Sequence, residues 1–138
     1  MTKIKHWHRN SSFIVAMNSM FNVLIIEDNS EFSENLRRCL LKLGCDVSVA
    51  ETAEGGIEKM QSFQYDAVFA SLCLHSLGGR GIARWVKQNE KSDTKFFLTT
   101  SWKGYLERDL LRVEGIHDVI RKPFSFNEIR DKVLEHLG

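Results

Sequence analysis

The sequence predicts an α/β domain in which a doubly wound, five-stranded parallel sheet carries helices on both faces. Strand-like and helix-like segments alternate from residue 21 to residue 138 as five βα units, and such alternation is typical of parallel sheets. Residues 67–70 and 96–98 are apolar without alternation, as expected of strands that are covered on both faces. Right-handed crossover connections then favour the strand order 2-1-3-4-5.

The individual elements follow from local patterns along the chain. The predicted strands lie at residues 21–26, 45–50, 67–70, 96–98 and 118–120, and the predicted helices at 30–43, 52–63, 81–89, 104–113 and 125–137. The first strand is a short run of β-branched and aliphatic residues, and the second alternates apolar with polar residues, as an edge strand does. Each helix places apolar residues three or four positions apart on one stripe, for example Leu36 and Leu40 in the first helix.

The helix ends have recognisable signals. Gly44 closes the first helix. The segment from Ser125 to Glu128 has the spacing of a capping box and predicts the start of the last helix. That helix is expected to bury Ile129, Val133 and Leu137, and the helix before it to bury Leu106, Leu110 and Val113.

Length and composition narrow the class of protein. The 138 residues suffice for one domain with a real core. The chain has 19 Lys and Arg and 18 Asp and Glu, so its net charge is close to zero. Such a charge gives no strong electrostatic attraction to nucleic acid or to a membrane surface. There is no signal peptide pattern and no apolar run of roughly 20 residues. Three cysteines without CxxC spacing suit reduced thiols, so we expect a cytoplasmic protein.

Residues 1–20 differ from the rest, which divides the chain into an N-terminal extension and a domain at residues 21–138. The extension carries Lys3, Lys5 and Arg9 and no acidic residue. We expect it to be flexible. A basic, aromatic arm that touches nucleic acid or an acidic partner is the alternative. His6 and His8 alone make a poor metal site, because two ligands leave most coordination positions open.

Polar residues gather where the predicted strands end. In doubly wound sheets, ligands bind outside the carboxyl ends of the strands, where the strand order reverses. This crevice would lie above strands 1 and 3 and would bring together Glu27, Asp28 and Ser71. Thr100 follows the fourth strand, and Lys122, which precedes the only proline, follows the fifth.

Together these motifs, in this order, resemble the receiver domains of bacterial response regulators over residues 21–138. The resemblance implies a flavodoxin-like receiver fold, and it carries part of the predicted strand order. It also implies that Glu27 and Asp28 are the acidic pair that holds Mg²⁺. Thr100, or Thr99 if the register slips by one, and Lys122 would contact the phosphoryl group, and the bond from Lys122 to proline is usually cis in this family.

The chain departs from the family at the central position. Ser71 stands where the family places the Asp that accepts the phosphoryl group, so both the acceptor and one Mg²⁺ ligand are missing. Asp66 cannot replace it, because it lies five residues earlier, roughly 16 Å away along a strand, and points to the other face. His75 and Val119 also replace residues that are usual in the family.

These features predict a stand-alone signalling module of two-component or phosphorelay signal transduction that is not an enzyme and is not phosphorylated. It would act through protein contacts with a histidine kinase, a regulator or an effector, and would bind Mg²⁺ only weakly. A conventional phosphorylatable receiver with a non-standard acceptor is the alternative. A small-ligand enzyme of this fold is not supported, because the loop after the first strand is acidic and lacks a glycine-rich phosphate motif.

Two further expectations concern the basic residues. Without a phosphoryl group, Lys122 should form an ion pair with Asp28 or Glu27. The surface made by residues 104–113, 118–120 and 125–137 is rich in arginine, a residue type enriched at interfaces. We expect this surface to carry a homodimer or partner contact, with a solvated helix surface as the alternative; its relevant residues are Arg108, Arg112, Val119, Arg121 and Arg130.

Overall fold

The computed structural model describes residues 21–74, 76–89 and 93–138. Its sheet consists of β1 (Asn22–Ile26), β2 (Asp46–Ala50), β3 (Ala67–Ser71), β4 (Lys95–Thr100) and β5 (Asp118–Arg121). All neighbouring strands are parallel and lie in the order β2-β1-β3-β4-β5. The predicted fold class and strand order are therefore confirmed. The predicted N-terminal extension and His75 lie outside the described residues.

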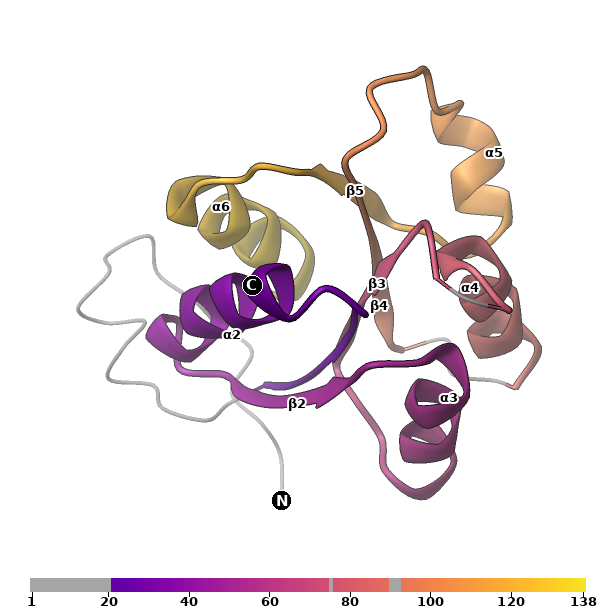
Figure 1. The fold of residues 1–138 in the computed structure, drawn as a ribbon, viewed down its shortest axis with the longest axis horizontal. Coiled ribbons are helices and arrows are strands. Elements are labelled where there is room, and N and C mark those ends of the chain that lie inside the picture. Colours follow the sequence, from indigo (N-terminus) through magenta and orange to yellow (C-terminus); the bar gives the residue numbers. More distant parts are fainter. Residues whose placement is uncertain (1–20, 75, 90–92) are drawn as a thin grey trace.

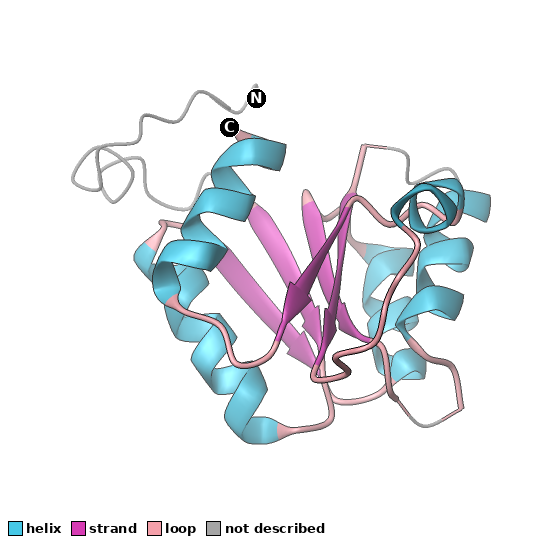
Figure 2. Ribbon diagram, turned by 90° about the horizontal axis from the view of Figure 1, so that it is seen from above, coloured by secondary structure: helices cyan, strands magenta, loops and turns pink. Residues whose placement is uncertain are grey.

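Helices cover both faces of the sheet (Figures 1 and 2). They are α2 (Ser30–Lys42), α3 (Ala53–Ser62), α4 (Gly79–Gln88), α5 (Arg108–Val113) and α6 (Phe126–Leu137). Helices α2 and α6 pack on one face, where the rings of Phe69 and Phe97 stack with their centroids 4.4 Å apart. Helices α3, α4 and α5 pack on the other face. No helix in the described part of the chain is long and apolar enough to cross a membrane.

The helix ends that the sequence indicates are formed by local hydrogen bonds. The Ser125 hydroxyl accepts the Glu128 backbone N–H at 3.2 Å, which confirms the predicted start of α6. Asn29 caps α2 in the same way, and Gly44 follows that helix with a φ of 85°. A positive φ is unstrained for glycine, so this residue can close the helix and turn the chain toward β2. Ile129, Val133 and Leu137 are buried as predicted.

Helix α5 is shorter than predicted. It begins at Arg108 rather than at Gly104, and Val113 is 66% exposed instead of facing inward. The reason lies in β5, where the Arg121 guanidinium donates to the carbonyl oxygens of Trp102 and Gly104 at 2.6 and 3.2 Å. These contacts hold the preceding segment in an irregular conformation. Leu111 is the α5 residue that packs inward, and the side chain of Leu110 lies outside the described part.

A cluster of charges joins α4 to the end of α5. Glu114 accepts hydrogen bonds from Arg80 at 2.5 and 3.0 Å and from Arg84 at 2.8 Å. The hydrogen bond from Arg80 is the largest influence on the pKa of Glu114 and, with the charges of both arginines, holds it below its usual value despite partial burial. The cluster therefore holds the short helix against its neighbour while Glu114 is ionised.

We expect Glu114→Gln to lower the free energy of unfolding by about 1 kcal/mol or less at neutral pH, because both arginines are substantially exposed. A carboxylate whose pKa is depressed by folding stabilises the protein above its unfolded pKa, and that contribution is lost as the pH falls through the folded pKa. The difference from wild type should thus shrink as the pH falls below about 4. Urea unfolding at a series of pH values measures this difference in stability. Glu58→Gln, at an exposed position of α3, is the control. A difference that persists in acid would contradict the charge-based explanation.

Candidate functional site

The predicted site residues lie at the carboxyl edge of the sheet. Glu27 follows β1, Ser71 ends β3, Thr100 ends β4 and Lys122 follows β5. Because all strands are parallel, these ends share one edge. The strand register supports this, since Ile26 pairs with Ala70, one residue before Glu27 and Ser71 on their respective strands.

A buried ion pair occupies the middle of this edge. The Lys122 ammonium donates to Glu27 Oε1 at 2.5 Å, and the two side chains are only 7% and 5% exposed. The other carboxylate oxygen of Glu27 accepts the Asn29 backbone N–H at 3.1 Å. Lys122 Nζ also lies 4.2 Å from the centre of the Phe32 ring, within range of a cation–π interaction. The predicted ion pair is confirmed, with Glu27 rather than Asp28 as the partner.

The backbone places Lys122 for this contact. Its N–H donates to the Thr100 carbonyl oxygen at 2.7 Å, which extends the pairing of β4 with β5 by one residue. The peptide bond from Lys122 to Pro123 is cis, as the resemblance implied. The lysine side chain extends from the end of β5 to Glu27, which follows β1 at the same edge.

The hydroxyl groups at this edge are engaged with nearby backbone. Ser71 is buried, and its hydroxyl donates to the Cys73 carbonyl oxygen at 3.3 Å. The Thr100 hydroxyl accepts the Trp102 N–H at 2.9 Å. Thr99, the alternative phosphate-contact residue, is also buried and pairs with Ser71 in the strand register. The hydroxyl groups of Ser71 and Thr100 thus each hold the backbone that follows their own strand.

The acidic pair is divided between two environments. Asp28 is exposed, whereas both oxygens of the Glu27 carboxylate are occupied by Lys122 and Asn29. Mg²⁺ requires near-octahedral coordination by oxygen ligands and usually takes one or two carboxylates plus phosphate and water. With no carboxylate at position 71 and a cation already on Glu27, the residues present do not fit a strong Mg²⁺ site.

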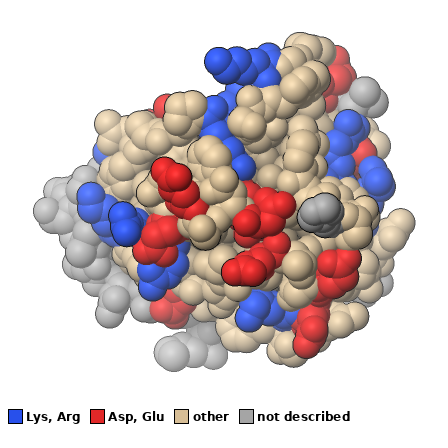
Figure 3. Space-filling view, viewed as in Figure 1, with Lys and Arg blue, Asp and Glu red and all other residues tan. Residues whose placement is uncertain are grey.

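The surroundings of this edge are acidic. Exposed carboxylates follow β1 and β2 at Asp28, Glu31, Glu51 and Glu54. The space-filling view shows acidic side chains gathered near the middle of the face that Figure 1 presents (Figure 3). A negative surface lowers the local concentration of anions such as phosphate donors.

Asp66 lies at the opposite edge of the sheet. Its carboxylate accepts the Asn22 N–H at 2.8 Å, and its own N–H donates to the Asn22 carbonyl oxygen at 2.8 Å. It therefore joins the amino ends of β1 and β3, far from position 71 as its place five residues earlier predicts. It takes no part in the site.

Comparison with known proteins agrees with this geometry. The family model described as the response regulator receiver domain matches residues 23–134. The chain belongs to the response regulator receiver domain family. As a receiver domain, it is a module of two-component signalling, and members of this family interact with histidine kinases and effectors.

Individual relatives place this receiver domain among diverse regulators. It is 31% identical over 113 residues to the transcriptional regulatory protein QseB of Escherichia coli O157:H7, covering 78% of this chain and 48% of QseB. It is 23% identical over 116 residues to Protein PilG of Pseudomonas aeruginosa, covering 83% of this chain and 86% of PilG. The response regulator TrrA of Thermotoga maritima, solved in complex with Mg²⁺ and BeF, is 26% identical with a TM-score of 0.75, covering 86% of this chain and all of TrrA. The chain spans only 21% to 48% of the length of three of the matched regulators, one of which is QseB.

Two features of this receiver domain were missed in the sequence. The first is Phe32 on α2, whose ring lies against the Lys122 ammonium. Lys132 and His136 lie four residues apart on α6 and both contact Asp118. The i,i+4 spacing of these two residues is the signal that could have indicated a shared partner.

Proposed function

We propose that this receiver domain transmits a signal by docking protein partners and is not switched by phosphorylation. The observation that carries the proposal is the Lys122–Glu27 ion pair beside the hydroxyl of Ser71. In a phosphorylatable receiver, the lysine pairs with the phosphoryl group on an aspartate. Here the lysine already has a buried anionic partner within the protein, and the group at the acceptor position is not a carboxylate.

The proposal predicts chemical inertness toward small phosphoryl donors. Incubation with acetyl phosphate and Mg²⁺ should add no acid-labile phosphate to the wild-type protein, because an acyl phosphate needs a carboxylate acceptor. Intact-mass spectrometry measures the adduct, and Ser71→Asp is the variant that restores the acceptor. An acid-labile adduct on the wild-type protein would support the conventional receiver and contradict the proposal. A stable phosphoserine that disappears in Ser71→Ala would contradict it as well.

The partner surface that we propose is the α5–β5–α6 face. Arg108 and Arg112 are exposed on α5, whereas Arg121 is held by the loop carbonyls and Arg130 pairs with Asp131 at 3.1 Å. The first two arginines therefore present the charge that is most accessible to a partner. This face could engage a histidine kinase, a regulator, an effector or a second copy of the chain.

Charge reversal tests this surface without disturbing the loop that Arg121 holds. Arg108→Glu/Arg112→Glu should reduce self-association in sedimentation or binding to a purified cognate kinase or regulator. Arg37→Glu/Arg38→Glu on α2 is the matched control. Equal binding by the wild type and the Arg108/Arg112 variant would place the docking surface elsewhere.

A further inference from the structure

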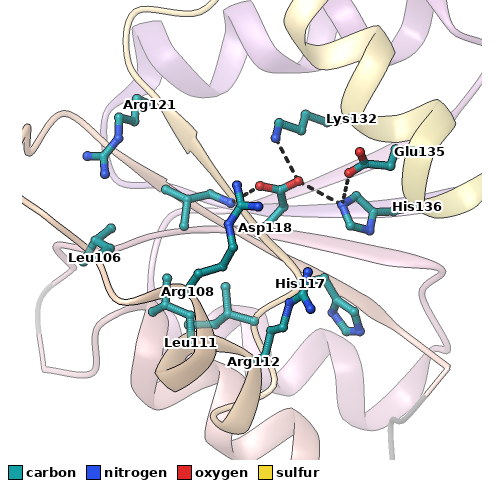
Figure 4. A pocket seen from close by; sticks show the side chains of 12 residues that line it. Leu106, Arg108, Leu111, Arg112, His117, Asp118, Arg121, Lys132, Glu135 and His136 are labelled. Atoms are coloured by element: carbon teal, nitrogen blue, oxygen red, sulfur yellow. Dashed lines mark hydrogen bonds and ion pairs between the residues drawn. The ribbon is translucent and has the colours of Figure 1, made fainter.

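A compact cluster of possible metal ligands lies at the amino end of β5, where it meets the last turns of α6 (Figure 4). His136 Nε2 lies 2.9 Å from Asp118 Oδ2 and 2.9 Å from Glu135 Oε2. Lys132 Nζ contacts the same Asp118 oxygen at 2.9 Å. Because Asp118 opens β5 and Lys122 follows its end, the cluster lies at the other edge of the sheet from the site described above.

His136 cannot hydrogen-bond to both carboxylates of this cluster at once. A single imidazole nitrogen faces two carboxylate oxygens, although it can carry at most one proton. One metal ion between the three side chains would interact with all three donor atoms at once. These atoms lie within 4.8 Å of one another, and ligands around a tetrahedral Zn²⁺ with bonds of about 2.0–2.1 Å lie roughly 3.3 Å apart. The Glu135 side chain is 65% exposed and would rotate to bring its oxygen to this spacing when the ion binds.

Two of the three side chains are held in place by contacts outside the cluster. The His136 ring packs edge-on against Phe97 with centroids 5.2 Å apart, and its side chain is 18% exposed. The Asp118 side chain is 13% exposed, and its Oδ1 accepts the Val119 N–H at 2.8 Å, which leaves Oδ2 toward the histidine. Burial alone would raise the pKa of Asp118, but hydrogen bonds from Lys132, His136 and the Val119 N–H hold it below its usual value. Such supporting contacts orient metal ligands.

We propose that Asp118, Glu135 and His136 form a binding site for a divalent transition-metal ion of the Zn²⁺ type. One imidazole and two carboxylates suit such an ion better than Mg²⁺, which prefers oxygen ligands alone. A fourth position remains open to solvent, because the cluster borders a pocket of about 530 Å³. The site goes beyond the proposed docking function and would connect β5 to α6 on the docking face.

The neighbouring charges set how tightly this site can bind. Lys132 competes directly for Asp118 and must move when the ion enters. The other cationic or titratable groups that line the pocket are Arg108, Arg112, His117 and Arg121. His117 is oriented away from metal binding through Nδ1, since this atom accepts the Phe96 N–H at 2.9 Å. If the cluster binds a metal ion, removal of the competing Lys132 should strengthen that binding. If the cluster is only a structural ion pair, the same change should not create metal binding.

Calorimetric titration of the full chain with Zn²⁺ tests the site. All samples carry His6→Ala, His8→Ala and Cys73→Ser, which remove other groups that could bind the ion. We expect one ion per chain, with binding weakened at least about tenfold by Asp118→Asn or Glu135→Gln. Lys132→Met should tighten binding several-fold. Asp131→Asn, a neighbouring α6 carboxylate outside the cluster, should leave the affinity unchanged.

The His136 ring provides a readout that is independent of stability. Its Nε2 nitrogen resonance should shift on addition of Zn²⁺ in the wild type and in Lys132→Met. Glu135 is largely exposed, so Glu135→Gln should fold normally even if a change at His136 does not. Absence of Zn²⁺ binding, or binding that Glu135→Gln and Asp118→Asn both leave unchanged, would overturn the proposal.

Discussion

Lys122→Met should lower the free energy of unfolding by about 3–5 kcal/mol, because it leaves the Glu27 carboxylate buried without a cation. The remaining partners of Glu27 are one backbone N–H and whatever water enters the space. Methionine keeps much of the apolar length of lysine and its contact with Phe32, so the loss reports on charge rather than on packing. Urea denaturation of both proteins at neutral pH measures the difference.

A double substitution separates the ion pair from the fold. Glu27→Gln/Lys122→Met removes both charges and should recover much of the stability, since replacing a buried ion pair as a whole is often close to neutral. Arg38→Met provides a control at an exposed ion pair, since Arg38 and Glu34 are 70% and 44% exposed, and about 1 kcal/mol or less is expected there. A loss in the free energy of unfolding for Lys122→Met no larger than that of the control would contradict the prediction. It would mean that water solvates the Glu27 carboxylate.

Ser71→Asp should create a Mg²⁺ site where we expect the wild type to bind the ion only weakly. The added carboxylate would lie at the end of β3 beside β1, which Glu27 follows, and it would supply the missing third oxygen ligand. We expect Mg²⁺ affinity to rise at least about tenfold. Without metal, the variant should be less stable than wild type, because a second buried carboxylate enters beside Glu27.

Thermal melts and calorimetry with Mg²⁺ distinguish these effects. Ligand binding to the folded state raises its stability, so Mg²⁺ should raise the Tm of Ser71→Asp and leave the wild type nearly unchanged. Ser71→Asn is the control, because asparagine is similar in size to aspartate but carries no charge. Equal Mg²⁺ affinities of the wild type and Ser71→Asp would mean that Glu27 and Asp28 are not arranged to share an ion.

Those parts of the fold that depend on local patterns could be predicted from the sequence. The order of elements and the start of α6 follow from hydrophobic periodicity and from the Ser125 cap. The start of α5 could not, because it depends on Arg121, which contacts carbonyl oxygens 17 and 19 residues earlier in the chain. Periodicity carries no information about such long-range contacts.

In the candidate site too, the sequence indicates which residues lie together but not which contacts they make. Motif spacing was enough to expect Glu27, Asp28 and Lys122 near one another, but the choice of partner for the lysine was not predictable. That choice depends on which of two adjacent side chains turns toward the sheet edge, and only Glu27 is buried there. The polar residues of α6 were missed because, in sequence, Lys132 and His136 look like part of a solvated helix surface.

The Lys122–Glu27 pair also bears on the order in which the chain can fold. Its partners are 95 residues apart in the sequence, so the pair closes a loop that contains nearly the whole sheet. Closing so long a loop carries a large entropy cost before the contact contributes any stabilisation. During synthesis, Glu27 emerges long before its cation and must stay hydrated until β5 has been made. The Glu27 carboxylate therefore reaches its final buried and paired environment only when β5 has docked.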